Sequence, residues 1–268
     1  MSDLPWNRTF DGQMLATICN RTTGRPLAII VAGHNGSGKS AMWYERLADE
    51  LKVPMINADR MMASILPEPN AAGQLRPWAK RLRDRSTRWM SISQKGVESF
   101  TAHAAADSAP FAIETVFSYW RKRFDGTHAS KADLIRMLQA RGYFVVLTFV
   151  GLASPTLSCA RVALRVSRGG HDVARAKLFS RFARTQQAIR HAIPLADAVV
   201  LVDNSRDTSR AFTTSYVTLG TKVLYDIRTE VAPPSEIRAW LDVVVPEAGS
   251  LPPSLAGMAP HANGAFTH

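Results

Sequence analysis

Cysteine is scarce in this sequence, since only Cys19 and Cys159 occur in 268 residues. Two distant cysteines cannot form the disulfide framework of a small secreted domain. Long apolar runs are also missing: the longest, YFVVLTFV at 143–150, has the length of a strand, whereas a bilayer span needs roughly 18 residues. The first residues, MSDLPWNRTFDG, lack the basic-then-apolar pattern of a signal peptide. We therefore expect a cytoplasmic protein without a membrane segment.

Acidic residues are fewer than basic ones, 22 against 33, and the formal net charge is +11. Such an excess attracts nucleotides, nucleic acid, anionic membranes or an acidic protein, and charge alone does not choose among them. Hydrophobic residues make up 46% of the chain, which is enough for a buried core. The length suits one large α/β domain with appendages.

Five short apolar runs predict strands, and each is nearly continuous in Val, Ile, Leu and Ala, as in a parallel sheet covered on both faces. The runs are 27–32, 53–56, 111–114, 143–150 and 198–203. The predicted helices are 39–51, about 75–105, 131–140, 157–167 and 175–192. This alternation predicts a three-layer α/β/α fold of the P-loop NTPase kinase type, with a five-stranded, mainly parallel sheet.

The C-terminal part adds a predicted hairpin at 211–227, turning near Leu219-Gly220, and a short helix at 235–241. We divide the chain into an N-terminal extension (1–24), a kinase domain (25–245) and a flexible tail rich in Pro, Gly and Ala (246–268). Within the kinase domain, an arginine-rich lid is expected at about 157–192.

The octapeptide GHNGSGKS at 33–40 fits the phosphate-binding pattern GxxxxGK(S/T), and it lies between a predicted strand and a predicted helix, as that pattern requires. Glycines let backbone N–H groups surround phosphate oxygens, and the helix N-terminus adds positive charge. Lys39 would reach the β and γ phosphates, and Ser40 would bind Mg²⁺. The predicted nucleotide contacts are Gly33, His34, Asn35, Gly36, Ser37, Gly38, Lys39 and Ser40. The alternative is a glycine-rich turn without a ligand.

Other motifs favour a kinase. The guanine-reading NKxD of GTPases and an LSGGQ-like signature of ABC-type ATPases are both missing. The run AVVLVDN at 198–204 imitates a Walker B strand, but it follows the arginine-rich helices, and we interpret it as a loop near the adenine. A kinase needs a base for the acceptor hydroxyl, cations for the phosphoryl group and a lid that expels water.

Two carboxylates stand where predicted strands end, and ligands bind at that edge of open α/β sheets. Asp59 follows VPMI, and Glu114 ends FAIE. Asp59 could accept the proton of an acceptor hydroxyl. The alternatives are that Asp59 only caps the next helix and that Glu114 forms an ion pair.

Cations gather at 161–184, where Asp172 is the only acidic residue. Arg161, Arg165 and Arg168 recur at spacings of four and three, which places them on one helix face. The following Gly169-Gly170 would permit a lid to move. A solvated basic surface is the alternative.

In their order, these motifs resemble the zeta toxin family of P-loop kinases. The shared segments are AGHNGSGKS, INADRMMASILP, FAIETVFS, RVALRVSRGGHDV and PLADAVVLVDNS, between about Ala28 and Ser205. The resemblance implies an ATP- and Mg²⁺-dependent kinase that acts as a bacterial toxin. Such enzymes phosphorylate the 3′-hydroxyl of the sugar in UDP-N-acetylglucosamine, and a cognate antitoxin blocks their nucleotide site.

The resemblance also implies site roles. The implied catalytic residues are Lys39, Asp59, Arg161 and Arg168, with His171 as an alternative to Arg168. The implied substrate contacts are Glu98 and Glu114. After Glu114 the family shows a Gly/Thr-rich turn and then an arginine, whereas this chain has TVFSYWRKRF. Ser118 and Arg121 are the candidates for these substrate-binding roles, and a base or ring could stack on Trp120.

Two further alternatives stay open. A P-loop kinase could act on another hydroxyl, of a dinucleotide, nucleoside, antibiotic or polynucleotide end. The segment RPWAKRLRDRSTRW at 76–89 would suit nucleic acid, although we favour a solvated or antitoxin-facing surface. A nucleotide-gated binding module without transfer is the second alternative, and Asp59 at the acceptor side argues against it.

Overall fold

The computed structural model describes Trp6, residues 8–20 and residues 24–246. The predicted tail beyond Pro246 lies outside the described residues. Among the described helices, none is long and apolar enough to cross a membrane.

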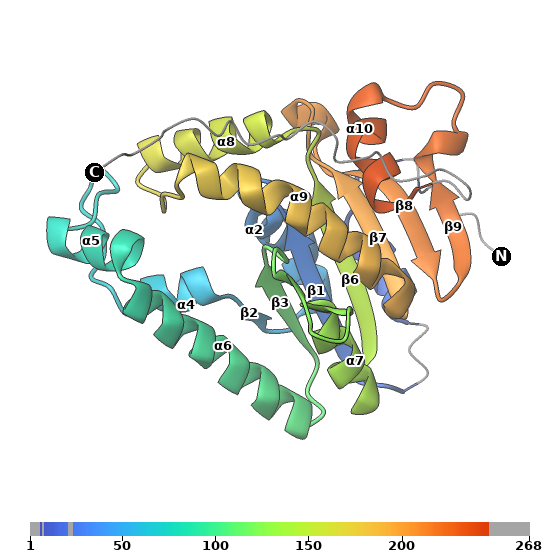
Figure 1. Cartoon of the computed structure of the whole chain (residues 1–268), viewed down its shortest axis with the longest axis horizontal. Coiled ribbons are helices and arrows are strands. Elements are labelled where there is room, and N and C mark those ends of the chain that lie inside the picture. Colours follow the sequence, from blue (N-terminus) through green and yellow to red (C-terminus); the bar gives the residue numbers. More distant parts are fainter. Residues whose placement is uncertain (1–5, 7, 21–23, 247–268) are drawn as a thin grey trace, which may run out of the picture.

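A seven-stranded sheet forms the centre of the molecule, in the order β2-β3-β1-β6-β7-β8-β9 (Figure 1). Its strands are β1 (Leu27–Gly33), β2 (Met55–Ile56), β3 (Phe111–Thr115), β6 (Phe144–Gly151), β7 (Ala198–Asp203), β8 (Thr213–Leu219) and β9 (Lys222–Asp226). The first five strands in this order are parallel, and β8 and β9 add an antiparallel hairpin. This arrangement confirms the predicted sheet and its C-terminal hairpin.

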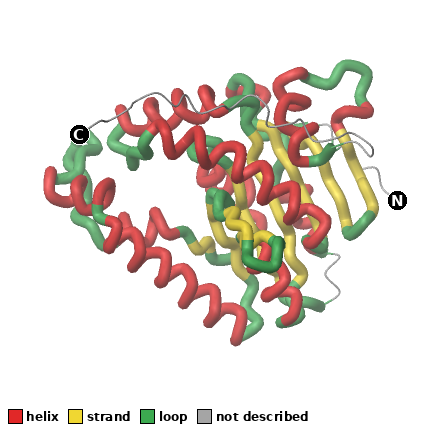
Figure 2. Tube along the Cα trace, in the orientation of Figure 1, coloured by secondary structure: helices red, strands yellow, loops and turns green. Residues whose placement is uncertain are grey.

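Helices cover both faces of the sheet, which gives three layers (Figure 2). On one face, Met14 of α1 (Gly12–Cys19) and Trp43 join Ile29 and Val31 of β1 in a buried cluster. On the other face, Ile30 and Leu147 pack with α6 (Thr87–Ala106), α7 (Ala132–Ala140), α9 (Arg175–Ala192) and α10 (Ser235–Val244). The alternate side chains of buried strands thus supply two cores.

The predicted helix at 39–51 is one continuous helical segment of α2 (Lys39–Met42), a π-helical turn (Trp43–Leu47) and α3 (Ala48–Leu51). The helix predicted across 75–105 is wrong as a single element, because it breaks at Ser86. That residue has an extended ψ of 103°, and its hydroxyl accepts a hydrogen bond from the Trp89 amide at 3.2 Å. Ser86 therefore starts α6 as an N-cap and separates it from α5 (Pro77–Arg85).

Three elements were not predicted from the sequence, and a fourth, the helix after β2, was expected there only as an alternative. Helix α4 (Ala58–Ser64) follows β2, and α1 carries the fully buried Met14 and Leu15. Strands β4 (Trp120–Lys122) and β5 (His128–Ser130) form a separate two-stranded sheet. Helix α8 (Pro155–Ser167) precedes α9, in agreement with the predicted helix pair.

Candidate active site

The loop between β1 and α2 is held by side chains from two distant segments. Asn204, just after β7, donates its amide to the Ser37 carbonyl at 2.8 Å, and the Ser158 hydroxyl of α8 donates to the Asn35 carbonyl at 2.7 Å. Gly38 has a φ of +90°, and a Cβ there would lie 2.6 Å from the Asn204 amide nitrogen. Only glycine suits this position, and the contacts from Asn204 and Ser158 hold the bend of the loop.

Lys39 is buried at the start of α2 with 7% of its surface exposed. Its ammonium donates to the His34 carbonyl at 3.0 Å. Burial lowers the pKa of Lys39 and Arg165 adds to this shift, while Glu114 and Asp59 oppose it. A buried cation in this position gains from a bound phosphate, because that anion offsets the desolvation of the ammonium.

His34, inside the loop, lies flat against Phe182 of α9, with ring centroids 3.8 Å apart. The edge of Phe149 completes its surroundings. In the described part of the chain neither ring nitrogen has a hydrogen-bond partner, and the side chain is 2% exposed. Burial, assisted by Lys39, lowers the pKa of His34 to about 3. The imidazole is therefore neutral at physiological pH and joins the loop to α9 by stacking.

Ser40, Glu114 and Asn57 form one hydrogen-bonded group at the carboxyl ends of β1, β3 and β2. The Ser40 hydroxyl lies 3.0 and 2.9 Å from the two oxygens of Glu114. Asn57 donates its amide to the same carboxylate at 2.6 Å. A hydroxyl and a carboxylate this close together match the oxygen ligands that Mg²⁺ prefers, with water and substrate phosphates supplying the rest. Within the described residues, no three His, Cys, Asp or Glu side chains gather to hold a metal by themselves.

Asp59 lies in the first turn of α4 and does not cap it. The N-cap is Asn57, whose side-chain oxygen accepts from the Asp59 and Arg60 amides at 2.8 and 3.2 Å. The Asp59 side chain is exposed, and its charge raises the pKa of Lys39 against the effect of burial. Burial lowers the pKa of Arg181, and the Asp59 carboxylate opposes this shift. The alternative in which Asp59 only caps a helix is thus wrong.

The arginines of α8 and α9, which the sequence assigns to a lid, contact different parts of the structure. Arg161 is half-buried and its guanidinium lies 3.5 Å from the Arg206 carbonyl, in the loop after β7. Burial lowers the pKa of Arg161 against the pull of Asp203. Arg168 is exposed at the end of α8. The charge of Arg165 lowers the pKa of Lys39, and the charge of Asp59 raises the pKa of Arg181 in α9. These two arginines therefore interact electrostatically with the site residues.

The predicted substrate contacts are not all gathered. Glu98 is exposed on α6, and within the described chain it has no hydrogen-bond or ion-pair partner. Ser118 is half-buried in the loop before β4, and Arg121 is exposed on that strand. His128 already stacks on one face of the Trp120 indole, with centroids 4.4 Å apart. The expected stacking of a ligand ring on Trp120 is therefore limited by this neighbour.

Asp203, at the end of the Walker B-like run, is fully buried. Its carboxylate is hydrogen-bonded to other groups of the protein. Its oxygen Oδ1 accepts from the Trp240 indole at 2.9 Å and from the Ser205 hydroxyl at 2.6 Å. Arg206 lies 3.5 Å away. Protein groups therefore occupy the carboxylate of Asp203, and the interpretation of 198–204 as a loop near the adenine stays a prediction.

Asn57 and Arg181 were missed as site residues. Asn57 stands two positions before Asp59, and its amide side chain after a strand end was the only available signal. Arg181 was one cation among many in the lid.

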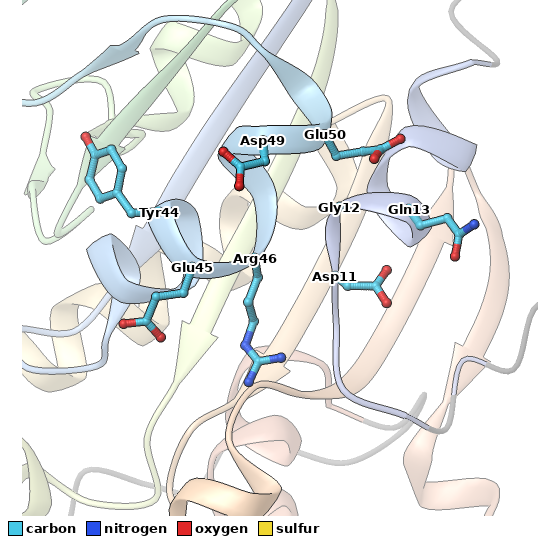
Figure 3. Close-up of a pocket in the computed structure, with 8 residues that line it drawn as sticks. All are labelled: Asp11, Gly12, Gln13, Tyr44, Glu45, Arg46, Asp49 and Glu50. Atoms are coloured by element: carbon cyan, nitrogen blue, oxygen red, sulfur yellow. The ribbon is translucent and has the colours of Figure 1, made fainter.

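A surface cavity of about 260 Å³ lies apart from these residues, between α1 and the helix that follows the nucleotide loop (Figure 3). Its lining residues are Asp11, Gly12, Gln13, Tyr44, Glu45, Arg46, Asp49 and Glu50. Four carboxylates and one guanidinium make it a poor place for a phosphate.

Three comparisons with known proteins show what this chain is similar to. A search of curated proteins found no match. A structure from the PezAT toxin–antitoxin system of Streptococcus pneumoniae is 13% identical, with a TM-score of 0.48, over 88% of this chain and 89% of that one. The AvrRxo1-ORF1:-ORF2 complex is 16% identical, with a TM-score of 0.52, over 79% of this chain and 64% of that one. The family model described as zeta toxin matches residues 13–228. The chain therefore belongs to the zeta toxin family.

Proposed function

We propose that this protein is a kinase that transfers the γ-phosphoryl group of ATP to a hydroxyl of a small molecule, with a UDP-sugar such as UDP-N-acetylglucosamine as the first candidate. The observation that carries the proposal is the contact of 2.9 Å between the Ser40 hydroxyl and the Glu114 carboxylate. The negative charges of Glu114 and Asp59 also raise the pKa of the buried Lys39, against the effect of burial. A hydroxyl, a carboxylate and a cation at one sheet edge are what a metal-assisted phosphoryl transfer uses.

The roles of the residues follow from their places. Lys39 binds the β and γ phosphates, and Arg165 and Arg181 offset charge on the transferring group. The acceptor oxygen bonds to the γ-phosphorus as its proton passes to Asp59, and the bond from that phosphorus to the bridging oxygen breaks to leave ADP. Ser40 and Glu114 would hold Mg²⁺, which when bound supplies charge neutralisation on the phosphates.

Asp59→Asn is the decisive variant, because it keeps the size of the side chain and removes the base. We expect the transfer rate to fall roughly 10²–10⁴-fold while nucleotide binding is unchanged. The assay incubates the protein with ATP, Mg²⁺ and UDP-N-acetylglucosamine, and in parallel with a bacterial metabolite extract, and identifies the phosphorylated product by mass spectrometry.

The matched control is Asp49→Asn, which removes an exposed carboxylate of α3 that lines the separate surface cavity. It should transfer at the wild-type rate. Equal rates for Asp59→Asn and wild type would reject the role of Asp59. Nucleotide binding without a phosphorylated product in any extract would reject the kinase and favour a binding module.

A protein antitoxin is the partner that this function implies. We propose that it covers the nucleotide site and so keeps the host cell alive. Expression of the protein alone should arrest growth, and expression of Asp59→Asn should not. Full arrest by Asp59→Asn would show that toxicity does not come from phosphoryl transfer.

A further inference from the structure

The C-terminal end of α5 is fastened to the turn between α8 and α9, at the end of the lid farthest from the sheet (Figures 1 and 2). Arg83 donates from its two terminal nitrogens to the Gly169 carbonyl at 2.9 Å and to the Gly170 carbonyl at 3.1 Å. The neighbouring Asp84 lies 3.2 Å from Nδ1 of His171. We call this set of Arg83, Asp84 and His171, with the two glycine carbonyls, the clasp.

The clasp is internally complete. Arg83 also donates from Nε to Asp84 at 2.7 Å, and both side chains are only 11% exposed. Burial opposes ionisation of Asp84, but Arg83 and His171 outweigh it and hold the pKa of Asp84 below its usual value. Gly169 has a φ of +84°, and a Cβ there would collide with the Gly73 carbonyl. The turn is therefore seated between α5 and the loop that precedes it.

The clasp attaches α5 to the turn between α8 and α9 by side-chain hydrogen bonds. Within α5 only Ala79 is buried, so apolar packing holds this helix weakly. Hydrogen bonds to a charged guanidinium are stronger than neutral ones, and a fork-shaped donor matches two carbonyls and a carboxylate at once.

One contact connects the clasp to the phosphate site. Arg165 of α8 donates from its guanidinium to the His171 carbonyl at 2.7 Å. The Arg165 charge also acts on Lys39. His171 is thus held by its ring to Asp84 and by its carbonyl to Arg165, and any shift of the turn must move the Arg165 guanidinium.

We propose that Arg83 and Asp84 are positioning residues that, through His171, keep Arg165 directed at the phosphates of the bound nucleotide. The proposal rests on the proposed function for the identity of the ligand. A clasp that only stabilised the fold would be independent of Arg165 in its effect on nucleotide binding, whereas positioning requires that its effect pass through Arg165.

The test is a double-mutant cycle on affinity for the Mg²⁺ complex of the β,γ-imido analogue of ATP, measured by calorimetry. Arg83→Lys keeps the charge but cannot make all three contacts, and we expect it to weaken binding about tenfold. Arg165→Ala should weaken binding at least as much. The double variant should bind as Arg165→Ala alone does, because Arg83 then has nothing left to position.

Arg81→Lys is the matched control: it lies on the same helix, is exposed, and should bind as the wild type does. Asp84→Asn serves as a second test variant and should behave as Arg83→Lys. Additive losses in the cycle, or unchanged binding by Arg83→Lys and Asp84→Asn, would overturn the proposal. A protein that binds the analogue but phosphorylates nothing would reject the proposed function, and the cycle would still decide the role of the clasp.

Discussion

Acid should destabilise this protein through His34, a single buried group that stacks on Phe182 of α9. The folded pKa of His34 is about 3, against an ordinary value of 6.5. Between these values the unfolded chain binds a proton that the folded protein does not, so the free energy of unfolding falls as the pH falls. The contribution of His34 is fully present above pH 6.5 and is lost progressively below it.

The size of the effect follows from the length of that window. Each pH unit inside it contributes about 1.4 kcal/mol. Acidification by two units below 6.5 should therefore remove roughly 3 kcal/mol, out of a total stability on the order of 5–15 kcal/mol for a typical domain. Solvent screening does not reduce this figure greatly, because the side chain is only 2% exposed.

The assay is urea unfolding at a series of pH values, followed by circular dichroism, for wild type and His34→Phe. Phenylalanine keeps the stacking on Phe182 and removes the titrating nitrogens. The difference in unfolding free energy between the two proteins should grow by roughly 3 kcal/mol over the two units. Parallel pH curves for the two proteins would refute the reasoning, since His34 would then titrate alike in both states.

Two other outcomes follow from the same structure. Gly38→Ala should cost about 1–3 kcal/mol of unfolding free energy and abolish nucleotide binding, because its φ is +90° and a Cβ would meet the Asn204 amide; wild-type affinity by calorimetry would contradict this. Burial raises the pKa of Cys19 to about 12, so a thiol reagent should leave Cys19 unmodified in the native protein and react with the half-buried Cys159; modification of both in a native peptide map would contradict this.

The sheet could be predicted because its signal is local. The residues of β6 and β7 are all buried, so their apolar runs are continuous and easy to recognise. The break at Ser86 was missed because the flanking residues favour helix, and a serine acts as an N-cap only when its own ψ leaves the helical region. The amino-acid composition around Ser86 does not predict which backbone conformation this residue adopts.

The site could be predicted only in part, for a different reason. The contact of Asn57 with Glu114 depends on β2 pairing with β3, which brings together positions far apart in the chain. The direction of Arg165 depends on the turn after α8, because its guanidinium donates to the His171 carbonyl in that turn. Spacing along one helix identifies a shared face but not which member of that face meets the ligand.

The contact between Trp240 and Asp203 restricts where the C-terminus of a shortened protein can be placed. The family match ends at residue 228, and an expression boundary chosen there would delete α10. The deletion would remove the Trp240 indole, which donates a hydrogen bond to the buried Asp203 carboxylate and packs against Gly151. Since the next residue, Asn204, braces the Ser37 carbonyl, the shortest useful fragment must run through Val244.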